Sequence, residues 1–260
     1  MENVSFFVLP LIGLIGGFLS GLLGLGGGVI MLPLLIFLGR IPLKLATGTS
    51  LVHILVAAAA GILSHFHAGM VDFKAGLILG TAGILGGFLG SFLSVSLTTV
   101  SLNLIFLSLV ALAIVFLFIP LKPYEGKYIK GNFSKIEGIL IGLGCGLFVG
   151  LLGLGGGFVL IPLMIYVLRI PLRVTIGTSL MIILISSMGT FGAKYGVGHI
   201  DVTITFLVIS GSIAGALLGA YVSRKTHTEF LRWILLSLLC LIFVYVGYKT
   251  LFSSFFSLFS

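Results

Sequence analysis

The chain of 260 residues is 59% hydrophobic and only 8% charged, with a formal net charge of +8. A water-soluble globular domain of this composition would expose too much apolar surface, so the composition excludes that class and predicts a membrane protein. The basic residues lie in short stretches between apolar runs, which is the positive-inside pattern of membrane proteins. We therefore expect a lipid bilayer as the surroundings and no nucleic-acid partner.

Ten apolar segments follow one another along the chain, and a hydrophilic linker separates them into two groups of five. They are predicted at about 5–24, 27–38, 44–64, 73–95, 99–120, 136–153, 156–168, 174–194, 202–223 and 229–252. The second segment of each group is too short for a hydrocarbon core of about 30 Å, so it is predicted to be a half-helix. The pattern predicts an all-α polytopic membrane protein with about 8–10 membrane segments.

An internal duplication relates the two groups at an offset of 129 residues. The motif Gly-Leu-Leu-Gly-Leu-Gly-Gly-Gly occurs at 21–28 and at 150–157, and 19 of the 31 positions in 21–51 are identical in 150–180. Repeats of this kind in membrane transporters meet near the midplane and form the substrate site. We predict an N-terminal transmembrane repeat at 1–121, a basic linker at 122–135 and a C-terminal transmembrane repeat at 136–260.

The positions of the charges test how the two repeats are oriented. With five crossings in each half the repeats are inverted, and ten Lys and Arg residues fall on the side of the linker against four on the other. With four crossings in each half the same residues divide seven and seven. The positive-inside rule favours the inverted arrangement, with the linker in the cytoplasm.

Two glycine-rich breaks precede the predicted half-helices. Consecutive glycines interrupt a helix and free backbone groups, and within a membrane a polar substrate can be their partner. The alternative is a tight crossing at which only glycine fits. The glycines proposed to bind substrate are Gly26, Gly27, Gly28, Gly155, Gly156 and Gly157.

A Gly-Thr-Ser motif recurs at 48–50 and 177–179, where it precedes a long apolar run. Thr and Ser are favoured N-caps, and the N-terminal end of a helix attracts anions. We predict that Thr49, Ser50, Thr178 and Ser179 line an anion site without a buried charged side chain. The alternative is N-capping alone.

His53 lies nine residues after Lys44, well inside a predicted span, where an ionisable residue is a candidate for function. It is our candidate for carrying a coupling proton. The alternative is a neutral, hydrogen-bonded core histidine, and the counterpart of His53 in the second repeat is Ile182.

Motifs for catalysis are missing from the sequence, because it has no Gly-x-Ser-x-Gly, no His-Glu-x-x-His and no Walker loop. We therefore expect no enzyme activity, no metal and no cofactor.

Glycines recur at every fourth position in several segments, which predicts close helix packing inside the chain or, alternatively, a homodimer interface.

The doubled motif, the proline that follows it, the Gly-Thr-Ser-Leu sites and Gly-x-x-Asp at 69–72 and 198–201 resemble the TauE/SafE sulfite exporter family of membrane permeases. The likeness covers about 9–95 and 138–224. It implies a multi-pass transporter in the cytoplasmic membrane of a bacterium or archaeon, with the glycine breaks and Gly-Thr-Ser sites as its motif residues. It also implies about eight spans from a four-span duplication, whereas the charge count favours five in each half.

What the resemblance implies for function is transport of a sulfur-containing anion such as sulfite, thiosulfate or a sulfonate like sulfoacetate. Because no nucleotide-binding motif is present, we expect a secondary transporter that works by proton-coupled alternating access. The alternatives are a passive anion channel and an intramembrane enzyme acting on lipid.

Overall fold

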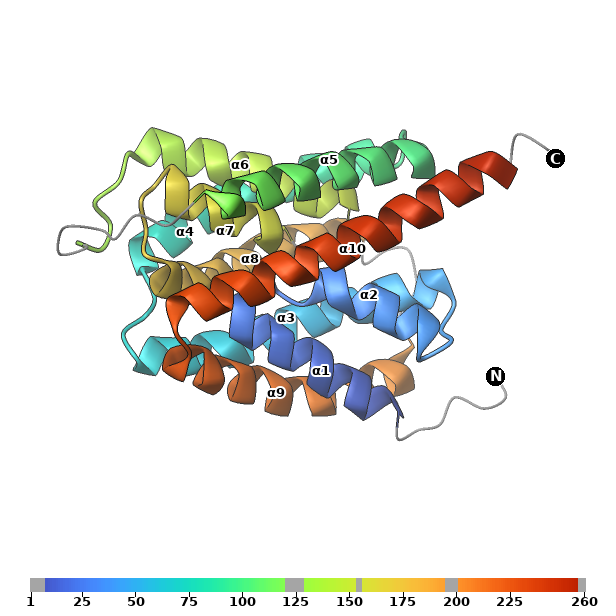
Figure 1. Cartoon of the computed structure of the whole chain (residues 1–260), viewed down its shortest axis with the longest axis horizontal. Helices are drawn as coiled ribbons and strands as arrows, with labels where there is room; N and C mark the ends of the chain where they lie inside the picture. Colours follow the sequence, from blue (N-terminus) through green and yellow to red (C-terminus); the bar gives the residue numbers. More distant parts are fainter. Residues whose placement is uncertain (1–7, 120–128, 153–155, 195–200, 257–260) are drawn as a thin grey trace.

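A computed structural model describes residues 8–119, 129–152, 156–194 and 201–256, which form ten α-helices (Figure 1). The first five are α1 (Val8–Leu23), α2 (Gly28–Phe37), α3 (Leu43–His67), α4 (Phe73–Ser94) and α5 (Thr99–Phe118). The other five are α6 (Lys135–Leu152), α7 (Gly157–Tyr166), α8 (Leu172–Lys194), α9 (Val202–Lys225) and α10 (Thr228–Phe256). The prediction of an all-α fold is confirmed.

Seven of these helices are long and apolar enough to cross a membrane, namely α3, α4, α5, α6, α8, α9 and α10. The helices α2 and α7 have only ten residues each, which is about 15 Å of helix. They occupy the two positions at which the sequence predicts half-helices, and each follows its glycine-rich break.

The most extensive helix contacts join α1 to α9 and α4 to α6, so the first helix of each half packs on the fourth helix of the other half. Glycine makes these contacts close. A Cβ on Gly17 would lie 2.3 Å from the carbonyl oxygen of Ser212, and one on Gly146 would lie 2.3 Å from that of Gly83. The glycine ladders of α1, α6 and α9 therefore pack helices within one chain, as small residues do in membranes.

The first and third helices of the two halves run in opposite directions. In Figure 1, α1 and α3 run from right to left, whereas α6 and α8 run from left to right. We call the left-hand end, where α5 ends and α6 begins, the linker end. Opposite directions for equivalent helices are what inverted repeats require. The domain boundaries at 121 and 135 stay predictions, and residues 120–128 of this region lie outside the described part of the chain.

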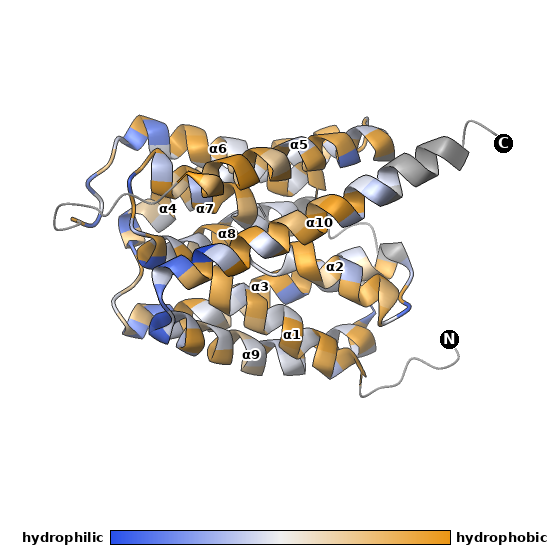
Figure 2. Cartoon of the chain, in the orientation of Figure 1, coloured by the Kyte–Doolittle hydropathy of each residue, from blue (hydrophilic) through white to orange (hydrophobic). Residues whose placement is uncertain are grey.

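Hydrophilic residues gather at the linker end, and the opposite end carries fewer of them (Figure 2). At the linker end α4, α6, α8 and α10 begin and α9 ends (Figure 1), and the basic residues in or next to the first or last turns of these helices are Lys74, Lys135, Arg173, Arg224, Lys225 and Arg232. At the opposite end, Arg40 lies in the turn between α2 and α3. The positive-inside rule predicts that the linker end is the cytoplasmic end.

The helices α3 and α8 lie at the centre of the fold. They pack on each other, and α3 also packs on α9 while α8 packs on α4. They are the most deeply buried of the seven long helices, with 56% and 67% of their apolar windows inside the protein. Side chains of α3 and α8 are therefore surrounded by protein, which is where a transporter holds polar groups at membrane depth.

Candidate functional site

The break between α1 and α2 has a backbone that requires glycine. Gly24, Gly26 and Gly27 have φ angles of 74°, 73° and 75°, in the left-handed region that side chains with a Cβ rarely adopt. In the break between α6 and α7, Gly155 lies outside the described residues, and Gly156 has an ordinary φ of −78°. The two breaks therefore share a sequence motif but differ in conformation at Gly27 and Gly156.

The two breaks meet in the core of the protein. A Cβ on Gly157 would lie 2.7 Å from the Cα of Leu25, so the start of α7 touches the first break directly. Ser179 of α8 reaches the same place, where its hydroxyl lies 2.8 Å from the carbonyl oxygen of Gly24 and donates to it. Gly26 packs against Ile183 of the same helix. The structure thus brings the first break, the end of the second and the second Gly-Thr-Ser motif together.

The Gly-Thr-Ser motifs are not N-caps, and this part of the sequence prediction is wrong. The helix α3 begins at Leu43 and α8 at Leu172, so the motifs lie in the second turn of each helix. Pro42 is the N-cap residue of α3, with an extended ψ of 143°, and Pro171 directly precedes α8. Each helix therefore starts right after its proline, where the missing N–H costs no helical hydrogen bond. The hydroxyls therefore do not cap the free N–H groups at the N-terminal ends of α3 and α8.

All four of these hydroxyl-bearing residues are buried, with at most 1% of their surface exposed, but their partners differ. Thr49 Oγ1 lies 3.3 Å from Thr205 Oγ1 on α9, and Thr178 Oγ1 accepts from a backbone N–H of the α3–α4 turn. Ser179 bonds to the first break as described above. Within the described structure, Ser50 Oγ has no hydrogen-bond partner.

Asp72 connects the second Gly-Thr-Ser motif to the linker end. Its backbone N–H donates to Thr178 Oγ1 at 2.9 Å. Its carboxylate accepts from the N–H of Ala75 at 3.1 Å, which caps α4, and from the N–H of Gly131 at 2.6 Å. Sequence reasoning assigned Asp72 no role, although the recurrence of Gly-x-x-Asp was a signal that could have shown it.

We expect Asp72→Ala to lower the free energy of unfolding by about 2–4 kcal/mol, because it removes a helix cap and a second charge-assisted hydrogen bond from a buried site. The matched control is Asp201→Ala. Asp201 caps α9 through the N–H of Ile204 and is only partly buried, so we expect a loss of about 1 kcal/mol. Thermal unfolding of both variants in detergent measures the difference, and equal melting temperatures would contradict this account of Asp72.

His53 lies beside the first break and is fully buried. Its Nδ1 lies 2.6 Å from Ser212 Oγ on α9. A Cβ on Gly27 would lie only 2.6 Å from its Nε2, so this nitrogen is directed at the start of α2. Within the described structure Nε2 has no hydrogen-bond partner. Only one of the two ring nitrogens of His53 is therefore hydrogen-bonded, whereas a structural core histidine has partners for both.

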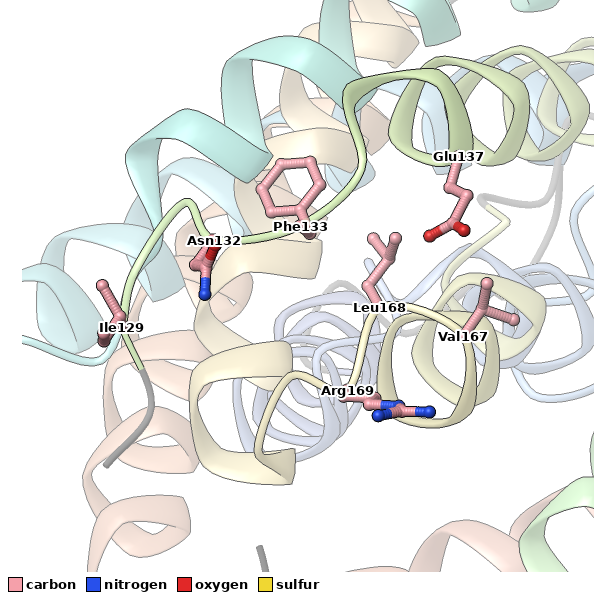
Figure 3. A pocket seen from close by; sticks show the side chains of 7 residues that line it. All are labelled: Ile129, Asn132, Phe133, Glu137, Val167, Leu168 and Arg169. Atoms are coloured by element: carbon pink, nitrogen blue, oxygen red, sulfur yellow. The ribbon is translucent and has the colours of Figure 1, made fainter. Parts of the chain in front are cut away.

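A separate pocket of about 340 Å³ lies at the linker end, between the start of α6 and the α7–α8 turn (Figure 3). It is lined by Ile129, Asn132, Phe133, Glu137, Val167, Leu168 and Arg169. In the figure, Glu137 and Arg169 border it from opposite sides. None of the residues predicted to bind substrate lines this pocket.

Buried broken helices within a bundle of apolar spans define a multi-pass membrane protein of the transporter class. The family model described as sulfite exporter TauE/SafE matches residues 9–246, and the chain belongs to this family. It is therefore a membrane transporter, with a small-molecule substrate and a lipid environment.

Curated relatives carry names of the same kind. The chain is 28% identical to the probable membrane transporter protein YunE of Bacillus subtilis, over 96% of this chain and 100% of YunE. It is 30% identical to YjnA of the same organism, over 88% and 94% of the two chains. A probable membrane transporter protein of Methanocaldococcus jannaschii is 27% identical over 92% and 95%. No solved structure gives a significant match.

Proposed function

We propose that the protein is a secondary transporter that moves a small sulfur-containing anion, such as sulfite, thiosulfate or sulfoacetate, across the cytoplasmic membrane. The observation that carries this proposal is the meeting of two helix breaks in the buried core, next to polar groups without partners. In secondary transporters, discontinuous helices at the midplane form the substrate site. The family description, sulfite exporter, supports the choice of a sulfur oxyanion.

The electrostatics of the first break favour an anion. The helix α2 starts at Gly28 with no side-chain cap, so the N–H groups of Gly28 and Val29 have no acceptor within the helix. These groups and the helix dipole present partial positive charge to the break. The proposed binding region comprises this helix end, the facing glycines Gly26 and Gly27, and the serines of the two Gly-Thr-Ser motifs.

His53 is the proposed carrier of the coupling proton. It is the eleventh of the 25 residues of α3, so it lies near mid-helix, and α1 and α2 contribute no titratable side chain to its surroundings. The described titratable groups of α3 itself and of the other helices packed on it lie toward helix ends: His65 and His67 of α3, Arg173 of α8, and Asp201, Tyr221, Arg224 and Lys225 at α9. His53 is therefore the titratable side chain that lies nearest mid-helix among these groups, which supports it as the carrier of a coupling proton.

Flux into liposomes tests the proposal. The purified chain is reconstituted, and uptake of sulfite, thiosulfate, sulfoacetate and sulfate is measured with and without an imposed pH gradient. We expect saturable uptake of at least one of the three sulfur anions, accelerated by the gradient in one direction. Uptake that rises in proportion to the anion concentration and does not change with the pH gradient would instead identify a passive channel.

We expect His53→Gln to abolish the acceleration by the pH gradient, because glutamine keeps a hydrogen bond to Ser212 but does not titrate. Counterflow, in which labelled anion exchanges against unlabelled anion without a gradient, should remain measurable. The matched control is His67→Gln, since His67 is exposed at the end of α3 and bonds to its own helix at Leu63. Full gradient dependence in His53→Gln would remove His53 from the coupling mechanism.

A further inference from the structure

The two breaks differ in the polar groups around them, although the repeats share the glycine motif. At the offset of 129 residues, Ser20 corresponds to Val149 and His53 to Ile182. Ser212, which holds His53, corresponds to Gly83. These three polar side chains of the first repeat therefore have counterparts without a hydrogen-bonding side chain in the second repeat, whereas Ser179, which also contacts the first break, has Ser50 as its counterpart.

The contacts show the same difference. A Cβ on Gly27 would lie 2.6 Å from His53 Nε2 and 3.2 Å from Ser20 Cβ. A Cβ on Gly156 would instead lie 2.8 Å from a methyl group of Val149, and the next nearest group is the backbone carbonyl of Cys145 at 3.2 Å. Gly27 of the first break therefore has polar side chains as its neighbours, whereas Gly156, at the described end of the second break, has an apolar one.

Ser20 is an unexplained polar group. Its side chain is fully buried, and its hydroxyl has no hydrogen-bond partner in the described structure. Leaving a buried hydroxyl or imidazole nitrogen unpaired is costly, and two such groups that face the same helix end can share one bound partner, a ligand or a water molecule. Two of them, Ser20 Oγ and His53 Nε2, flank the uncapped start of α2.

We propose that the transported anion is bound at the first break, through Ser20, His53 and the N-terminal end of α2, and that Gly156, at the described end of the second break, is an apolar packing position. This inference rests on the proposed function as an anion transporter. Ser20 O–H and the free N–H groups of α2 donate to the oxyanion, whose charge the helix end stabilises.

Ser212 positions the imidazole for this role. Its hydroxyl donates its single proton to the carbonyl oxygen of Val208 at 2.7 Å, so it accepts a hydrogen bond from His53 Nδ1–H. The neutral ring then presents the lone pair of Nε2 to the break. When Nε2 takes up a proton, it becomes a donor to the anion. Proton and anion therefore favour each other's binding at one atom, which is a physical basis for moving them together.

Binding of labelled thiosulfate, sulfite and sulfoacetate to the purified full chain in detergent tests the proposal, with thermal unfolding as a second readout. For Ser20→Ala we expect the dissociation constant of the transported anion to rise about tenfold, as for the loss of one hydrogen bond to a charged group. Without anion, the melting temperature should stay the same or rise, because the variant removes a buried hydroxyl that has no partner.

Two variants near the second break are matched controls. Ser91→Ala also removes a buried, unpartnered hydroxyl, from a residue of α4 that packs against Gly150 at the end of α6. Gly156→Ala adds a methyl group where φ is ordinary. Both should bind the anion within about twofold of the wild type. Ser20→Cys, which keeps the size of the side chain but donates weakly, replaces Ser20→Ala if the latter does not fold.

The outcomes separate this inference from the proposed function. If the wild type neither binds nor transports any of the three anions, both fail. If the wild type transports an anion and Ser20→Ala binds it with unchanged affinity, only the assignment to the first break fails. An affinity loss in Gly156→Ala as large as that in Ser20→Ala would also overturn it, because it would place the second break in the site.

Discussion

Gly27→Leu is expected to abolish transport in liposomes. A residue with a Cβ is strained at the φ of 75° by about 1–2 kcal/mol, and the new side chain would start 2.6 Å from His53 Nε2. The leucine would therefore displace the imidazole and fill the region proposed for the anion. Uptake of the labelled substrate is the measurement, and uptake at the wild-type rate would show that the break is not closely packed.

Gly156→Leu is the comparison for Gly27→Leu. Its φ of −78° accepts a side chain, but a leucine would meet the methyl group of Val149 and the backbone of Cys145. We expect it to block transport as well, through overpacking at the junction of α6 and α7. The two variants then lose transport for different reasons: Gly27→Leu fills the proposed anion site, and Gly156→Leu overpacks the junction of α6 and α7. Binding of the labelled anion in detergent distinguishes them, because only Gly27→Leu removes the binding site itself.

Gly146→Leu is expected to prevent folding, which is the largest effect on stability that we predict. A Cβ at this position would lie 2.3 Å from the carbonyl oxygen and 2.6 Å from the Cα of Gly83, so α6 could not approach α4 without a shift of the whole helix. Size-exclusion chromatography of the protein in detergent should show aggregation or loss of material.

Gly144→Leu is the control on the same helix, two residues away. A Cβ at Gly144 has no neighbouring atom within 4 Å, so a leucine there has room. This variant should elute and melt as the wild type does, within the small effect of a surface substitution. Similar behaviour of the two variants would mean that the glycine ladder does not hold α4 and α6 together.

The helices were predictable from sequence because hydropathy and glycine act locally. The predicted half-helices at 27–38 and 156–168 appear as α2 and α7, shorter by a residue or two at each end. The starts of the next helices were also predicted closely, at 44 and 174 against Leu43 and Leu172. What failed was the interpretation of the Gly-Thr-Ser motifs as N-caps. The helix α3 begins right after Pro42 and therefore before the Gly-Thr-Ser motif, and the hydrogen-bonding pattern of the folded chain shows where its first turn lies.

The candidate site was only partly predictable. Repetition in the sequence drew attention to Ser179, and the structure places it on the first break. It could not reveal Ser20 or Ser212, because neither residue is repeated at the offset of 129 residues. Their relation to His53 depends on how α1, α3 and α9 cross, which is a property of the packing between the two halves.

The first helix of each half packs on the fourth helix of the other half, and this arrangement affects how the chain folds during synthesis. The glycine-lined face of α1 meets its partner α9 only after most of the protein has been made. Until then the earliest hairpins remain in lipid with an uncovered groove that any other small-residue helix can occupy. Correct folding in the membrane therefore depends on the insertion of α9 soon after it is synthesised. Neither half can form the bundle around the core without the other half.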